Sequence, residues 1–201
     1  DATDDAGATR SAPIFVIVAP AVTEVRMLGD LTSGRYAIPA GLSDAVSVCL
    51  NGNPARVFAI KRDGTVVGWG GGVVDAFSVP TGLANIVSLV AANDYVLALK
   101  SDGTVTGWGT DSQLANIPSG LKDVVAISAR GHALALKSNG TVVSWGVDTN
   151  GSTSVPADLV DVVAVSAGSG HSLALKQDGT VVAWGYNYYG ETTVPADLVD
   201  V

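Results

Sequence analysis

The chain has 201 residues, of which 47% are apolar and 15% charged, and its net charge at pH 7 is −8. This composition is typical of a folded chain and not of a disordered one, and the acidic balance disfavours a nucleic-acid-binding surface, which needs clustered Lys and Arg. No apolar run approaches the roughly 20 residues that a membrane-spanning helix needs.

Residues 1–13 form a polar segment rich in small residues, in which we expect no strand. Because the sequence opens at Asp1 with such a segment, we expect an exported chain, secreted or displayed at the cell surface; a trimmed chain is the alternative. Two short apolar runs follow, at residues 14–19 and 24–28. They predict two strands of a degenerate first repeat.

From residue 45 onward the sequence consists of near-copies of one segment, each closed by a Trp-Gly pair. The Trp residues fall at 69, 108, 145 and 184, so they are separated by 39, 37 and 39 residues. A fixed period in this range indicates stacked supersecondary units. We predict one domain over residues 14–201 with five repeats, at about residues 14–44, 45–85, 86–123, 124–161 and 162–201.

Each repeat is predicted to hold four short strands, and the last repeat shows them most clearly. Its strands A to D are expected at residues 162–166, 172–176, 180–184 and 191–194, the last of them ending before Pro195. An Asp-Gly or Asn-Gly pair separates strands B and C in every full repeat. It predicts a type I′ hairpin turn with positive φ at both residues. The pairs are Asp63-Gly64, Asp102-Gly103, Asn139-Gly140 and Asp178-Gly179.

Strand B predicts that both faces of each sheet are buried. Leu173 and Leu175 point to one face, and the small residues Ser172 and Ala174 point to the other. Large side chains on one sheet then meet small ones on the next, which is the packing of a β-propeller blade. The run at residues 198–201 resembles the start of a further strand A. It is expected either to complete the first repeat and close the ring, or to pair between chains and give an oligomer or polymer.

Repeats that read Gly-His-Ser-Leu-Ala-Leu-Lys-x-Asp-Gly-Thr-Val-Val-Ala-Trp-Gly resemble the regulator-of-chromosome-condensation repeat (RCC1-like repeat). The likeness is strongest over residues 162–195 and is closest to the short bacterial form, which includes propeller-type β-lactamase inhibitory proteins. It implies an all-β propeller, usually of seven blades, whereas this sequence holds five repeats. For the inhibitory proteins it implies aromatic and acidic contact residues on the loops of one face.

Strand order predicts which loops share a face. If strand A runs up, the A–B and C–D loops lie together and the Asp-Gly turns lie at the opposite end. This end carries our candidates for partner binding: Asp94, Asp111, Arg130, Asp148, Tyr186, Asn187, Tyr188 and Tyr189. The three tyrosines offer contact area at low entropic cost, although one or two of them packing on a neighbouring repeat is the alternative. Since only this loop supplies an aromatic cluster, β-lactamase inhibition is disfavoured.

The sequence gives no support for a catalytic, cofactor or metal site. His132 and His171 occupy equivalent positions in successive repeats, which gives no converging ligand shell, and we expect each to cap the A–B turn through the backbone. The Trp residues are predicted to be core anchors, and Cys49, the single cysteine, a buried structural thiol.

We therefore expect a secreted, non-enzymatic propeller that binds a protein or a glycan through its A–B and C–D loops. The alternative is an extracellular structural or filament subunit that assembles by exchange of terminal strands. Neither expectation includes a nucleic acid, a cofactor or a membrane span.

Overall fold

We analysed a computed structural model of the chain. It describes residues 2–3, 9–10, 15–18, 25–28, 37–51, 56–70, 77–92, 94–196 and 198. The chain divides into two compact units, Asp1–Ala84 and Asn85–Val201, which we call the N-terminal and C-terminal units and describe separately.

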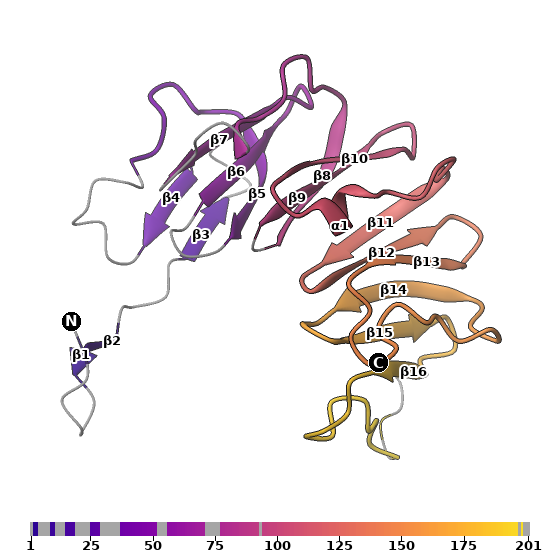
Figure 1. The fold of residues 1–201 in the computed structure, drawn as a ribbon. Helices are drawn as coiled ribbons and strands as arrows, with labels where there is room; N and C mark the ends of the chain where they lie inside the picture. Colours follow the sequence, from indigo (N-terminus) through magenta and orange to yellow (C-terminus); the bar gives the residue numbers. More distant parts are fainter. Residues whose placement is uncertain are drawn as a thin grey trace. The chain divides into compact units, whose positions relative to one another are not determined.

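The N-terminal unit contains two short hairpins and one three-stranded antiparallel sheet (Figure 1). Strands β3 and β4 coincide with the two apolar runs predicted to be strands, and they pair with each other. Strands β1 and β2 pair within residues 1–13, where we expected none. The strands are β1 (Ala2–Thr3), β2 (Thr9–Arg10), β3 (Phe15–Val18), β4 (Val25–Leu28), β5 (Ala45–Asn51), β6 (Arg56–Lys61) and β7 (Val66–Gly70).

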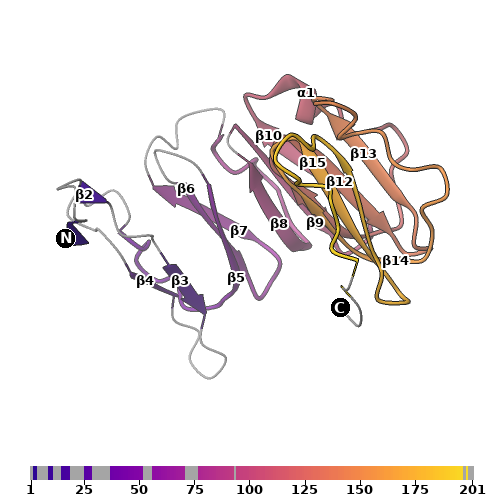
Figure 2. The same cartoon turned by 90° about the horizontal axis from the view of Figure 1, so that it is seen from below.

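The C-terminal unit contains three sheets of the same kind, each an antiparallel meander of three consecutive strands. In Figure 1 they follow one another in chain order. Figure 2 shows the same strands from below, where the sheets overlap in projection. Their strands are β8 (Ile86–Ala92), β9 (Tyr95–Lys100), β10 (Val105–Gly109), β11 (Val124–Ala129), β12 (His132–Lys137), β13 (Val142–Gly146), β14 (Val162–Ala167), β15 (His171–Lys176) and β16 (Val181–Gly185).

The four meander sheets, β5–β7, β8–β10, β11–β13 and β14–β16, have three strands each, where we predicted four. The segment expected as strand D of the last repeat, residues 191–194, lies in turn and irregular backbone. Its donors are used locally, because Thr192 N donates to Asn187 Oδ1 at 2.9 Å and Thr193 N to Gly190 O at 3.0 Å. An amide that is bonded within its own loop cannot extend a ladder to strand C. The run at residues 198–201 lies outside the described residues apart from Leu198.

Packing between sheets of the C-terminal unit follows the predicted alternation of large and small side chains. Leu134 and Leu136 on β12 are buried against a cluster on the next sheet that includes Ala174 and Trp184. On the opposite face of β12, Ala133 and Ala135 belong to a cluster with the large residues Leu97 and Leu99 of the preceding sheet. The middle sheet of the C-terminal unit is therefore covered on both faces, as a propeller blade requires.

The B–C hairpins close through a different turn from the predicted type I′. Only the glycine has a positive φ, +77° at Gly64, and the preceding Asp63 does not. Gly64 N donates to Lys61 O at 2.9 Å, and Lys61 N donates to Thr65 O at 2.8 Å. This is a three-residue loop in which a turn is followed by a left-handed glycine.

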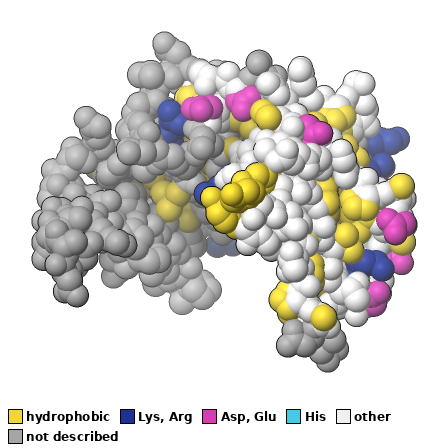
Figure 3. Space-filling view, turned by 60° about the horizontal axis from the view of Figure 1, so that its bottom comes forward, with side chains coloured by type: hydrophobic (Ala, Val, Ile, Leu, Met, Phe, Trp, Pro, Cys, Tyr) yellow, Lys and Arg dark blue, Asp and Glu magenta, His cyan; other side chains and the backbone are white. Residues whose placement is uncertain are grey.

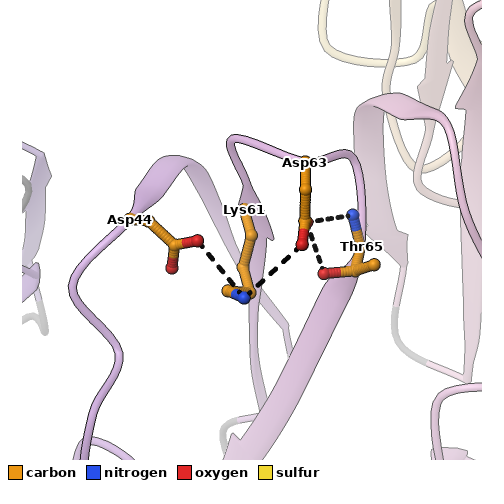
Figure 4. Close-up of polar contacts among 4 residues, drawn as sticks. All are labelled: Asp44, Lys61, Asp63 and Thr65. Atoms are coloured by element: carbon orange, nitrogen blue, oxygen red, sulfur yellow. Dashed lines mark hydrogen bonds and ion pairs between the residues drawn. The ribbon is translucent and has the colours of Figure 1, made fainter.

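The aspartate in this turn acts as an acceptor for the residue after the glycine (Figure 4). Asp63 Oδ1 accepts from Thr65 N at 2.9 Å and from Thr65 Oγ1 at 2.6 Å. Lys61 Nζ lies 3.2 Å from Asp44 Oδ2 and 3.7 Å from Asp63 Oδ2. The Asp-Gly pair is thus selected by a side-chain hydrogen bond in addition to backbone conformation.

In the C-terminal unit, the first two hairpin turns are also bonded to the start of the next sheet. Val124 N donates to Gly103 O at 3.0 Å, and Val162 N donates to Gly140 O at 3.2 Å. The residues before these valines, Asp123 and Asp161, have φ values of +61° and +59°. Asp and Asn tolerate this left-handed conformation better than other non-glycine residues. The link between successive sheets is therefore built into the repeat.

Candidate interaction surface

Because the strands of each sheet in the C-terminal unit are antiparallel, the loops that connect them lie at two opposite ends of the sheet. The hairpin end carries the Asp-Gly and Asn-Gly turns. The opposite end carries the loops between the first and second strands and the loops after the third strand. We call this second set the loop surface, and it comprises residues 94, 110–116, 130–131, 147–154, 168–170 and 186–193. All eight candidate residues for partner binding lie in it.

Asp94 and Asp111 are joined through the backbone at the first part of this surface. Asp94 O accepts from Thr110 N at 2.8 Å and from Asp111 N at 3.1 Å, and the Asp94 side chain is exposed. Asp111 is the N-cap of a short helix, α1 (Ser112–Ala115), because its Oδ1 accepts from Gln113 N at 2.8 Å and Leu114 N at 3.2 Å. We had expected no helix here, although Asp before Ser-Gln-Leu is a recognisable capping signal.

Arg130 lies where the loop tips of two successive sheets touch. Its neighbour Gly131 donates from N to Gly168 O at 3.2 Å, and a Cβ at position 131 would collide with Ser169 O. The Arg130 side chain is exposed. The close backbone approach therefore requires glycine at position 131 and places the 130–131 tip beside the 168–170 tip.

The Asp148 loop and the tyrosine loop meet at Gly170. A Cβ built on Gly170 would lie 3.1 Å from Thr149 Cγ2 and 3.4 Å from Tyr186 Cβ, so both loops flank the same glycine. Asp148 is exposed, and its Oδ1 accepts from Thr153 N at 3.0 Å. Tyr186 N donates to Gly170 O at 2.8 Å. The structure thus brings together Asp148 and the tyrosine cluster, which are 38 residues or more apart in the sequence.

The three tyrosines are not equivalent. Tyr188 and Tyr189 expose 76% and 83% of their surface, whereas Tyr186 is half-buried. The rings of Tyr186 and Tyr188 are stacked with centroids 6.3 Å apart, and Tyr188 and Tyr189 meet edge to face at 4.8 Å. Exposed hydrophobic and acidic side chains also occur together on the molecular face drawn in Figure 3. The loop therefore presents two accessible aromatic faces supported by a third ring.

Hydrogen bonds within the tyrosine loop hold its backbone. Tyr189 N donates to Glu191 Oε2 at 2.9 Å, and the amide of Asn187 lies 3.4 Å from Thr193 Oγ1. Asn187 Oδ1 accepts from Thr192 N, as described above. Asn187, which we had predicted as a contact residue, therefore has a structural role in the loop, and Glu191 is a loop acid that the sequence interpretation did not single out.

Beneath the loop surface lies a buried polar network that the sequence did not reveal. His132 Nε2 lies 2.6 Å from Ser172 Oγ, Ser172 Oγ donates to Ser152 O at 2.9 Å, and Trp184 Nε1 donates to the same carbonyl at 3.0 Å. His132, Ser152 and Ser172 are fully buried. The prediction that His132 caps a turn through the backbone is wrong, because its partner is a side chain 40 residues away. Burial lowers the pKa of His132, which favours the neutral ring.

The remaining residues singled out in the sequence are the four Trp residues and Cys49. The four Trp residues are buried, as predicted for core anchors. Burial raises the pKa of the Cys49 thiol to about 12, which removes the thiolate that nucleophilic chemistry needs. Across the described ranges, no group of three or more His, Cys, Asp or Glu side chains is arranged to hold a metal ion. In the same part of the chain, no helix has the length and apolar character needed to cross a bilayer.

Residues 162–191 match the family model of the Regulator of chromosome condensation (RCC1) repeat. This segment of the chain is therefore similar to an RCC1 repeat. No curated protein sequence matches the chain, whereas many solved structures do. One of them is yeast RCC1 (Prp20) bound to Kap60, with a TM-score of 0.64 and 20% identity over 88% of this chain and 49% of that chain. Another is Prp20p from Saccharomyces cerevisiae, with a TM-score of 0.61 and 18% identity over 82% of this chain and 52% of that chain. A third is the ectodomain of the Physcomitrella patens receptor kinase CR4, with a TM-score of 0.60 and 22% identity over 72% of this chain and 43% of that chain.

The chain thus spans about half the length of these structures. At this level of identity the likeness shows the fold, which is that of a β-propeller. The number of blades and the closure of the ring stay predictions, as does the division into a single domain of residues 14–201.

Proposed function

We propose that this RCC1-like protein is a non-enzymatic binding module that recognises another macromolecule, a protein or a glycan, through its loop surface. The observation that carries the proposal is the pair of exposed tyrosines, Tyr188 and Tyr189, on a loop whose backbone is already fixed. Tyr combines a large apolar area with few rotatable bonds, so it loses little entropy on binding. A pre-organised loop loses still less. Export of the module to the cell surface or the medium is part of the same proposal.

The fold supports this function in general terms, since yeast RCC1 has been seen in complex with a protein, Kap60. Side chains of the loop surface that could do chemistry are otherwise engaged: Asp111 caps a helix and Asp148 holds its own loop. The Ser172–His132 pair resembles a nucleophile and its base, but both side chains are fully buried. A substrate would have to open the interface between two sheets to reach them.

The test is a triple substitution of Tyr186, Tyr188 and Tyr189 by Ala. Binding partners would be captured from the source organism and on a glycan array with immobilised wild-type and variant protein. The matched control is Val87→Ala/Val125→Ala/Val163→Ala, which removes three exposed hydrophobic side chains from the first strands of the same unit. We expect the tyrosine variant to lose its partners while the valine variant retains them. If both variants retained their binding partners equally, the loop surface would be rejected as the binding site.

A second candidate function, self-association, is favoured by a difference between two equivalent leucines. Leu159 and Leu198 both follow a turn in which their amide donates to a proline carbonyl, at 3.1 and 3.2 Å. Leu159 is 7% exposed because it packs on β12 and β14, whereas Leu198 is 42% exposed. Leu173 and Leu175 on β15 are likewise only partly covered, unlike their counterparts Leu134 and Leu136. We propose that this face accepts another repeat of the same type.

Mass photometry and light scattering over a wide range of protein concentration test this second function. A concentration-dependent oligomer that Leu198→Asp dissociates would support it. A monomer at all concentrations would exclude it without affecting the tyrosine loop.

A further inference from the structure

The distribution of charge in the C-terminal unit indicates which kind of macromolecule the loop surface accepts. All lysines of the unit lie at the hairpin end, close to the turns or to the start of a first strand: Lys100, Lys122, Lys137 and Lys176. The loop surface carries four carboxylates, Asp94, Asp111, Asp148 and Glu191, and one cation, Arg130, which gives a net charge of −3. Among the described residues, the hairpin end also carries five aspartates (Asp102, Asp123, Asp158, Asp161 and Asp178), so its net charge is −1. The loop surface is thus the more acidic end, and its acids are not interspersed with lysines.

The carboxylates of the loop surface are bonded mainly to neutral groups. Asp148 and Glu191 each accept a backbone N–H through one oxygen, at 3.0 and 2.9 Å. In the described part of the C-terminal unit, no ion pair to any of the four loop acids is found, whereas Lys176 Nζ at the hairpin end lies 3.4 Å from Asp178 Oδ2. Charge of one sign without a nearby counter-charge attracts a partner of the opposite sign.

The exposed aromatic faces lie within the same acidic region. Tyr186 and Thr149 flank Gly170, so the tyrosine loop adjoins the loop of Asp148, and Glu191 is bonded to the amide of Tyr189. The faces of Tyr188 and Tyr189 are accessible, and an aromatic face attracts a guanidinium or ammonium group through its quadrupole. Aromatic stacking and carboxylates thus favour the same type of ligand at one place.

We infer that the loop surface binds a protein segment bearing exposed Arg or Lys, with cationic side chains placed over Tyr188 and Tyr189 and paired with Asp148 and Glu191. This inference rests on the proposed function and specifies its partner. A neutral glycan gains nothing from the net charge, and an anionic glycan or nucleic acid is repelled by it. Arginine is favoured over lysine, because its planar group both stacks on rings and pairs with carboxylates through two hydrogen bonds.

The test uses the full chain and three fluorescent peptides of equal length with alternating Gly-Arg, Gly-Gln and Gly-Glu sequence. The loop variant Asp94→Asn/Asp148→Asn/Glu191→Gln removes three charges but keeps the acceptor oxygens, and it leaves the helix cap Asp111 intact. The matched control Asp123→Asn/Asp158→Asn/Asp161→Asn removes three charges at the hairpin end. Asn tolerates the positive φ of positions 123 and 161. The two variants have the same net charge, and thermal melts check that both are folded.

We expect the Gly-Arg peptide alone to bind, with affinity falling about tenfold or more in the loop variant and less than about twofold in the hairpin-end control. Added salt should weaken the wild-type complex. Equal loss in both variants, absence of Gly-Arg binding to the wild type, or equal binding of the Gly-Gln peptide would overturn the inference. If Tyr→Ala substitutions abolish capture of natural partners while the loop amide variant retains them, the proposed function stands and the cationic partner is rejected.

Discussion

The side chains of His132 and Ser172 meet between adjacent sheets of the C-terminal unit, with 2.6 Å between Nε2 and Oγ. Ser172 Oγ has one proton, which it donates to Ser152 O. His132 therefore donates from Nε2 to Ser172 Oγ, and we assign the Nε2–H tautomer from this network. His132 Nδ1 has no hydrogen-bond partner among the described residues. In this tautomer Nδ1 carries no proton and is an unpaired acceptor. An unpaired buried acceptor destabilises the fold less than an unpaired buried donor would.

Removing the hydroxyl at the centre of this network should destabilise the fold. Ser172→Ala leaves the His132 N–H without an acceptor in a fully buried place, so we expect a loss of about 1–3 kcal/mol in the free energy of unfolding. Urea titration would measure it. Ser166→Ala, an exposed position on the neighbouring strand, is the control and should change stability by less than about 0.5 kcal/mol. Equal effects of the two substitutions would contradict the network.

The same histidine should make stability depend on pH. Burial lowers the folded pKa of His132 below its ordinary value of 6.5, with His171 acting in the same direction and Asp148 opposing. Below pH 6.5 the unfolded chain binds a proton at this ring before the native state does, so stability is lost as the pH falls and recovers as it rises. Melting temperatures between about pH 7 and about pH 5 should fall less steeply in His132→Gln than in the wild type. Parallel curves would exclude a titrating His132.

The hairpin turns should tolerate an amide in place of the acid. Thr180 donates to Asp178 through both N and Oγ1, which lowers the pKa of Asp178 to about 2. At pH values above its ordinary pKa of 3.8, the ionised Asp178 side chain stabilises the fold, and this contribution is lost as the pH falls toward 2. Asn139 makes the same two bonds to Thr141 at 3.1 and 2.7 Å. Asp178→Asn keeps both hydrogen bonds but loses the charge, so it should melt slightly below the wild type at neutral pH and above Asp178→Ala, as followed by circular dichroism.

The tip contact between successive sheets should be sensitive to a single methyl group. Gly131→Ala places a Cβ against Ser169 O, and because this atom belongs to the backbone, relief requires the two tips to move apart. We expect a loss of about 1–3 kcal/mol, as for other overpacked sites. Arg130→Ala, at an exposed side chain one residue earlier, serves as the control. A Gly131→Ala variant as stable as this control would show that the tips are not in close contact.

The Cys49 thiol should be inert in the native protein. Its pKa of about 12 leaves almost no thiolate at pH 8, and its strand is paired with β6. A thiol-specific chromogenic reagent should therefore label Cys49 only after denaturant is added. Rapid labelling of the folded protein would show that this strand opens readily.

The repeat and its packing could be predicted because they depend on local patterns. Leu134 and Leu136 alternate with alanines, and this alternation alone determines which face is large and which is small. The predicted propeller fold is confirmed by its likeness to solved structures, and the predicted resemblance to the RCC1 repeat by the match over residues 162–191. The turn at Asp178-Gly179 was assigned to the wrong type, because the dipeptide does not reveal that the flanking residues Lys176 and Thr180 close the ladder.

The candidate site was predictable only in outline. Antiparallel connectivity correctly places Asp94, Arg130 and Tyr186 at one end of their sheets. The partner of His132 is a residue of the next repeat, and no spacing rule within one repeat identifies it. The difference in exposure between Tyr186 and Tyr189 depends on how closely the Gly170 tip approaches, which is a property of the assembled sheets.

The bonds from Val124 N to Gly103 O and from Val162 N to Gly140 O have a consequence for how such chains lengthen. The repeat that starts at Val124 carries both halves of the joint, the Val124 amide at its start and the Gly140 carbonyl at its hairpin, so a duplication of this segment would insert both at once. Growth or loss of whole segments during evolution then needs no compensating change in the neighbours. If the duplicated segment were one residue too long or too short, the Asp with positive φ would no longer precede the valine that makes the bond. Duplication of a whole period keeps the two residues in place.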